Sequence, residues 1–116
     1  MKIISFAWTT EALKKGLKTQ TRRFWKDRHA RRFKKGDRVL AYDRLPHAGG
    51  KPIAVIELTD DPYQEKFAEI SHEDFIAEGG YFYWDGRLDF IDLLKGAGKG
   101  DAVWVVKFKL CQVLNG

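Results

Sequence analysis

The sequence GLKTQTRR, residues 16–23, joins the N-terminal part of the chain to everything that follows it. It begins with a glycine, and its last six positions hold one lysine, two threonines and two arginines. Arginine forks match the geometry of phosphate oxygens, so this cluster suits anion binding. A threonine hydroxyl beside a base can also become a nucleophile. The alternative is an exposed edge strand that carries solvated charges.

The segments on both sides of residues 16–23 predict a chain built mainly of strands. Apolar alternation predicts strands at residues 2–8 and 102–114, and mostly apolar runs predict strands at residues 38–42 and 52–59. Short helices are expected at residues 11–15, 71–78 and 87–95, with one helical turn inside residues 24–32. Gly16 and Gly36 are suited to the left-handed backbone that ends a helix or makes a turn.

Strands at both ends of the chain, without the long helices of parallel crossovers, favour a small antiparallel barrel. The fold class expected is therefore α+β, mainly β, with short helices that cover the barrel. The last strand, residues 102–114, either forms an exposed edge or closes this barrel.

Length and composition limit the class of protein. The 116 residues are expected to form a single domain, residues 1–116. With 44% hydrophobic and 32% charged residues, the composition is globular rather than disordered. Cys111 is the one cysteine, so no intramolecular disulfide can form, and a reducing, cytoplasmic setting is expected. The sequence contains no apolar run of the length of a signal peptide or a membrane span.

The net charge of +5 is distributed unevenly along the chain. Of the 21 lysines and arginines, 12 lie between Lys14 and Arg38, where the acids are Asp27 and Asp37. Residues 60–92 show the reverse balance and carry 10 of the 16 acids. A chain polarised in this way can present one basic face to a polyanion, and nucleic acid is the leading class of partner.

The spacing of Gly16, Lys18 and Arg23, followed by the Gly36–Asp37 turn into a strand, resembles the ASCH domain of the PUA-like superfamily. The resemblance covers nearly the whole chain. It implies a PUA-like small β-barrel with flanking short helices and a basic cleft for RNA or modified nucleosides. Within this family the chain is similar to the small bacterial amidohydrolases that remove the acetyl group from N(4)-acetylcytidine.

These amidohydrolases use a lysine, a threonine three residues later and a downstream glutamate, which Lys18, Thr21 and Glu78 match. The resemblance implies that Thr21 is the nucleophile and Lys18 its base, while Glu78 protonates the leaving amine or orients water. For Lys18 to act as a base its pKa must fall well below the usual range, and burial and neighbouring cations act in that direction. In a regular strand, positions 18 and 21 point to opposite faces, so a shared pocket requires a turn or bulge.

Binding of the substrate or of RNA is expected from cations and aromatic rings together. Arg22 and Arg23 belong to the basic motif, and nucleobases stack on rings such as those of Trp25, Tyr83 and Trp84. The alternative for the aromatic run that holds Tyr83 and Trp84 is that alternate members pack in the core.

No metal site and no cofactor are predicted. His29, His47 and His72 are far apart in the sequence and form no ligand pair at helical or hairpin spacing. The expected partner is a modified nucleoside or RNA, and no membrane partner is expected. Two further functions stay open: a non-catalytic RNA-binding module that uses the same cleft, and a metal-assisted ribonuclease.

Overall fold

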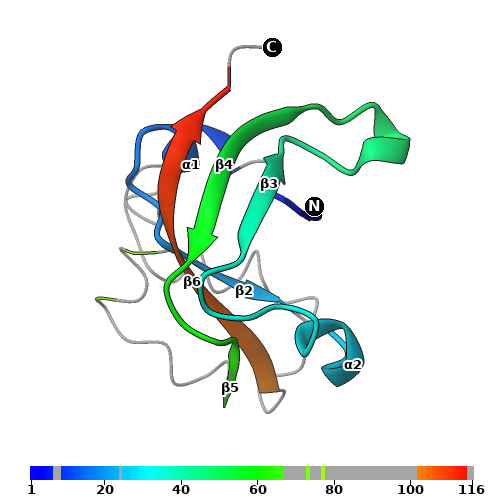
Figure 1. Cartoon of the computed structure of the whole chain (residues 1–116), viewed down its shortest axis with the longest axis vertical. Coiled ribbons are helices and arrows are strands. Elements are labelled where there is room, and N and C mark those ends of the chain that lie inside the picture. Colours follow the sequence, from blue (N-terminus) through cyan, green and yellow to red (C-terminus); the bar gives the residue numbers. More distant parts are fainter. Residues whose placement is uncertain (7–8, 24, 67–72, 74–76, 78–101, 115–116) are drawn as a thin grey trace.

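The computed structural model describes residues 1–6, 9–23, 25–66, 73, 77 and 102–114 (Figure 1). Its elements are β1 (Lys2–Ser5), α1 (Thr10–Lys14), β2 (Gln20–Arg23), α2 (Asp27–Ala30), β3 (Arg38–Tyr42), the 3-10 helix η2 (Pro46–Ala48), β4 (Pro52–Leu58), β5 (Tyr63–Lys66) and β6 (Ala102–Val113). Of the predicted helix at residues 71–78, Glu73 and Ala77 are described, and both are helical. The predicted helix at residues 87–95 lies outside the described residues.

The described strands form one curled sheet in the order β1-β3-β4-β6-β2, with β5 paired to β6. β1 and β3 are parallel, and every other pairing is antiparallel. The sheet bends into a half-barrel, with α1 against β4 and β6 and with α2 beyond the end of β2 (Figure 1). This confirms the predicted α+β, mainly β fold with a small barrel and short helices.

β6 is the central strand of the sheet rather than an exposed edge. Trp104 pairs with Arg23 of β2 on one side and with Gln64 of β5 on the other. Farther along β6, residues 108–113 pair with β4. One long strand therefore ties β2, β4 and β5 together, and residues 103–108 of this strand are buried or half-buried on both faces.

The core fills the inside of the curl. Alternating residues of β3 and β4 point inward, and Leu13 of α1 packs against them with no exposed surface. The buried cluster comprises Ile4, Phe6, Leu13, Phe33, Val39, Ala41, Ala54, Ile56, Leu58, Val106 and Phe108. Val103 and Val105, on the opposite face of β6, are fully buried as well.

Arg23 links the two ends of the strand order. Its Nη2 donates a hydrogen bond to the carbonyl oxygen of Ser5 in β1 at 2.6 Å. Its guanidinium also lies over the Phe6 ring, 5.2 Å from the ring centroid. Because β1 and β2 stand at opposite ends of the sheet order, this side chain bridges the opening of the half-barrel.

Most local predictions agree with the structure, and the differences have simple causes. α1 ends before Gly16, whose φ is 73°, and Gly36 turns the chain into β3 with a φ of 89°. The sequence does not predict β5, because its residues, Tyr-Gln-Glu-Lys, show no alternation of apolar and polar side chains. This strand forms because β6 offers it a partner. Among the described segments, no helix has the length and apolar character needed to cross a bilayer.

Candidate functional site

The polar residues that precede and form β2 are buried, although their types are usually exposed. Lys18 and Thr21 are each 3% exposed, Arg22 is 6% exposed and Gln20 is 9% exposed. The interpretation of this segment as an exposed edge with solvated charges is therefore wrong. Buried polar groups of this kind require internal partners, so their arrangement is specified by the fold.

Backbone hydrogen bonds hold the segment in place on three sides. The amides of Leu17 and Lys18 both donate to the carbonyl oxygen of Ala12, at 3.0 and 3.3 Å. The amide of Phe108 in β6 donates to the carbonyl oxygen of Thr19 at 3.0 Å, and the amide of Thr19 donates to the carbonyl oxygen of Ala77 at 2.7 Å. Residues 18–21 are therefore fixed against α1, β6 and Ala77.

The hydrogen bond between Thr19 and Ala77 involves sequence neighbours of the three predicted catalytic residues. Ala77 is the residue before Glu78, and its partner Thr19 lies between Lys18 and Thr21 in the sequence. Chain segments nearly sixty positions apart are thus joined at this point. Glu78 itself, like Tyr83 and Trp84, lies outside the described residues.

The regular part of the strand begins only at Gln20. Lys18 belongs to the non-regular stretch before it, residues 17–19. Strand alternation therefore does not force Lys18 and Thr21 onto opposite faces, which was the geometric obstacle to a shared pocket.

The two arginines of the motif lie on opposite faces of β2. Arg22 pairs with Glu65 of β5, with Nη2 and Nε at 3.0 and 3.2 Å from Oε1, and its Nη1 donates to Gln20 Oε1 at 3.1 Å. The Arg22 side chain is 1% exposed and that of Glu65 is 18% exposed. The charge of Arg22 is thus balanced by a carboxylate on its own face.

Arg23 lies on the face that carries Thr21. Its Nε donates to Thr21 Oγ1 at 3.0 Å, while its Nη2 donates to the Ser5 carbonyl oxygen. A guanidinium beside a hydroxyl oxygen stabilises negative charge that develops there. Because the oxygen acts as acceptor in this contact, the hydroxyl hydrogen can be donated to another group.

Trp25 holds α2 against the core. Its ring stacks on Phe33 at 4.7 Å with an interplanar angle of 21°, and it meets the His29 ring edge-on at 4.7 Å. One face of the indole is thus occupied by Phe33. If a nucleobase stacks on Trp25, as the sequence predicts, it must use a part of the indole that Phe33 does not cover.

Three features of this region were not found from the sequence. In the sequence, Glu65 is only one member of an acidic stretch, and nothing marks Gln20 as the acceptor of a hydrogen bond from Arg22. The hydrogen bond between Thr19 and Ala77 joins segments that are far apart in the chain, so no local pattern predicts it. The described residues include no group of three or more His, Cys, Asp or Glu side chains that could hold a metal ion.

Comparisons with known proteins bear on the fold. No family model matches the sequence, and no curated protein matches it. Among solved structures, the chain is similar to protein EF3133 from Enterococcus faecalis V583, of family DUF984, with a TM-score of 0.67 and 16% sequence identity. The match covers 99% of this chain and 82% of that chain. At this identity, the likeness shows the small β fold alone, and the ASCH resemblance stays a prediction.

Proposed function

We propose that this chain is an ASCH-type amidohydrolase that removes the acyl group from N(4)-acetylcytidine or a related modified nucleoside. The observation that supports this most is the hydrogen bond from Thr19 to Ala77, because it joins the Lys18–Thr21 segment to the residue that precedes Glu78. The three residues that the resemblance requires come from segments connected at this point.

The proposed reaction begins with the hydroxyl of Thr21. Its Oγ1 attacks the acyl carbon while the uncharged amine of Lys18 takes the hydroxyl proton. Lys18 is 3% exposed, so its amine is enclosed by the protein and shielded from bulk water. Glu78 then protonates the amino group of cytidine as the C–N bond breaks, which leaves an ester of the acyl group on Thr21. Water hydrolyses this ester to the free acid, and the Thr21 hydroxyl is restored with the proton that Lys18 took.

Arg23 takes a role here that differs from the substrate contact expected from the sequence. Its Nε is 3.0 Å from Thr21 Oγ1, so it fixes the hydroxyl and stabilises negative charge on that oxygen as the proton leaves. We therefore assign Arg23 as a positioning residue for Thr21. Arg22, which is paired with Glu65 on the other face, is expected to contribute through the stability of β2.

The decisive experiment is incubation of the purified protein with N(4)-acetylcytidine, with release of cytidine followed by chromatography. Lys18→Met replaces the amine by an uncharged side chain of similar length, and turnover is expected to fall about 100-fold or more because the base is lost. Lys14→Met is the matched control, since Lys14 is a partly exposed lysine of α1, and it is expected to retain full activity. Thermal unfolding of both variants checks the fold.

Two other outcomes favour the other candidate functions. If no acylated cytidine is hydrolysed but the protein binds RNA with a steep salt dependence, the chain is a binding module. If it cleaves RNA and a chelator abolishes the cleavage, it is a metal-assisted ribonuclease. Retained activity in Lys18→Met would contradict the assignment of the base.

A further inference from the structure

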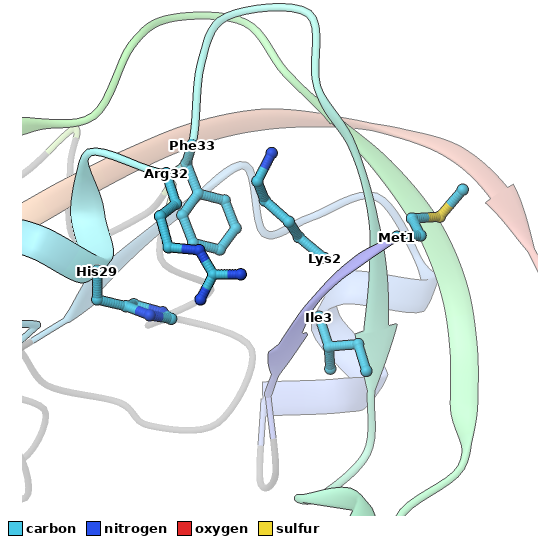
Figure 2. A pocket seen from close by; sticks show the side chains of 6 residues that line it. All are labelled: Met1, Lys2, Ile3, His29, Arg32 and Phe33. Atoms are coloured by element: carbon cyan, nitrogen blue, oxygen red, sulfur yellow. The ribbon is translucent and has the colours of Figure 1, made fainter.

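A second group of cations lies around α2, outside the segment of residues 18–23. It lines two adjoining hollows, which we name together the α2 groove. The first, of about 320 Å³, is lined by Lys26, Arg28, His29 and Arg32. The second, of about 210 Å³, is lined by Met1, Lys2, Ile3, His29, Arg32 and Phe33 (Figure 2). His29 and Arg32 form part of both hollows.

Of the four lysines and arginines that line the α2 groove, Lys2 pairs with Asp37 at 2.8 Å, and the other three are not paired with an acid within the described part of the chain. Lys26, Arg28 and Arg32 are exposed, and among the described residues none of the three side chains has an ion-pair or hydrogen-bond partner. The nearest acid in the sequence, Asp27, is engaged elsewhere. Its Oδ1 accepts hydrogen bonds from Trp104 Nε1 at 3.2 Å and Gln64 Nε2 at 3.4 Å, which direct the carboxylate toward the sheet.

The groove stands on a rigid base. Phe33 is 2% exposed and belongs to the core, and it stacks with Trp25. His29 contacts both of these rings edge-on, at centroid distances of 4.7 and 5.4 Å, and remains exposed. Arg28 of α2, with Lys26 before the helix and Arg32 after it, is therefore displayed from a packed segment, and a ligand does not have to order the backbone on binding.

We propose that the α2 groove binds the phosphodiester backbone of single-stranded RNA, with Lys26, Arg28 and Arg32 contacting phosphate oxygens. Arginine forks match phosphate geometry, and the exposed His29 ring beside them can contact a nucleobase. The apolar side chains of Met1 and Ile3 on the far wall of the second hollow suit a ribose or a base (Figure 2). Two connected hollows fit successive nucleotides of a strand better than one isolated phosphate.

Nucleic acid is favoured over an anionic membrane by the side chains of α2. Ala30 is 1% exposed, and the other positions of the helix are charged or polar, so the helix has no apolar side chain to insert into a bilayer. This inference goes beyond the proposed function. It depends on the residues of the α2 groove and on none of the residues assigned to the reaction, and it would allow the protein to hold a strand that contains a modified cytidine.

The test measures the affinity of the full chain for a fluorescein-labelled 12-nucleotide RNA by fluorescence anisotropy, at several salt concentrations. The groove variant carries Lys26→Gln, Arg28→Gln and Arg32→Gln. The control variant carries Arg44→Gln, Lys51→Gln and Lys66→Gln, which lower the net charge by the same three units outside the groove. The groove variant is expected to bind roughly tenfold or more weakly. The slope of log K against log salt, which is negative, is expected to become less steep by about 2, because single-strand contacts contribute roughly 0.7 each.

The control variant is expected to bind within about threefold of the original chain, since exposed charges outside the contact act only through the screened field. Equal losses in both variants, or no RNA binding by the original chain, would overturn the proposal. So would binding to phosphatidylserine vesicles that depends on the three groove residues while RNA binding does not. Failure of the amidohydrolase assay leaves this result unaffected, because binding is measured without turnover.

Discussion

At the scale of single residues, the position of Thr21 depends on one neighbour two residues along the strand. Thr21 is 3% exposed, and its Oγ1 accepts from Arg23 Nε at 3.0 Å. A hydroxyl in this state is fixed in one orientation, which a nucleophile requires. The same arrangement has a structural value, since a buried guanidinium hydrogen needs an acceptor.

Substitution of Thr21 separates these two roles. Thr21→Val keeps the shape and removes the hydroxyl, so hydrolysis of N(4)-acetylcytidine is expected to be lost. Thr21→Ser keeps the hydroxyl, and measurable turnover is expected to remain. The measurement is kcat for both variants by chromatography, with circular dichroism to confirm the fold. Equal activity in Thr21→Val and the original chain would remove Thr21 from the reaction.

At the scale of elements, β5 is attached to β2 across β6 by one ion pair. The Arg22 side chain is 1% exposed, and it pairs with the Glu65 carboxylate on the same face of the sheet. Removal of one member leaves the other charge buried, and fully buried pairs lose roughly 3–5 kcal/mol in this way. This ion pair adds to the backbone pairing with β6 that holds the polar strand β5 in the sheet.

Glu65→Gln is expected to lower the free energy of unfolding by about 2 kcal/mol, less than for a fully buried pair because Glu65 retains contact with solvent. Glu57→Gln is the matched control. Glu57 pairs with Arg38 and Lys109, whose side chains are 65% and 62% exposed, so a change within about 0.5 kcal/mol is expected. Urea unfolding of the three proteins provides the comparison, and equal losses would show that the buried position of Arg22 has no energetic consequence.

The turn that precedes β3 is stabilised by the carboxylate of Asp37. Its Oδ2 accepts from Lys2 Nζ at 2.8 Å and from the Lys34 amide at 2.9 Å, so it ties β1 to the turn. The hydrogen bond from Lys2 contributes most to lowering the pKa of Asp37 below its usual 3.8, followed by the Lys34 amide, while partial desolvation acts in the opposite direction.

A lowered pKa in the folded state means that the ionised Asp37 stabilises the fold at neutral pH. This contribution is complete above the unfolded pKa and is lost as the pH falls through the lower pKa of the folded state. Asp37→Asn is therefore expected to be less stable than the original chain at pH 7, with a difference that shrinks as the pH drops below about 3.8. Urea unfolding from pH 7 to pH 2.5 measures this, and a difference independent of pH would contradict it.

At the scale of the whole molecule, the half-barrel is held at its opening by a side chain. Arg23 donates to Ser5 of β1 and to Thr21 of its own strand, and its guanidinium covers the Phe6 ring. The ends of the sheet order are therefore joined by the same residue that fixes the candidate nucleophile. Stability of the barrel and geometry of the site are coupled through this residue.

Arg23→Lys keeps the charge but loses the fork, so one ammonium cannot reproduce both hydrogen bonds in their geometry. The free energy of unfolding is expected to fall by about 1.5–3 kcal/mol, the value of a hydrogen bond to a charged group. Arg28→Lys, an exposed arginine of α2, is the control and is expected to change stability by less than about 0.5 kcal/mol. Thermal and urea unfolding test this, and an unchanged Arg23→Lys would show that the bridge does not hold the barrel.

The sequence by itself determined the features that depend on neighbouring residues. The apolar run at residues 38–42 defined β3 with its observed bounds, and Gly16 and Gly36 marked two turns because only glycine adopts positive φ at low cost. The apolar alternation of residues 102–114 defined β6 to within one residue. These signals are local, so they can be read along the chain.

Only the tertiary structure decided which partner each polar side chain meets. Nothing in the order Lys-Thr-Gln-Thr-Arg-Arg shows that Arg22 pairs with Glu65, that Arg23 bridges to Ser5, or that Thr19 binds Ala77. β5 likewise has no signal of its own and exists because β6 lies beside it. The curvature of the sheet decides which distant segments come into contact. The free energy of burying a charged side chain depends in turn on whether these contacts give it an oppositely charged or hydrogen-bonding partner.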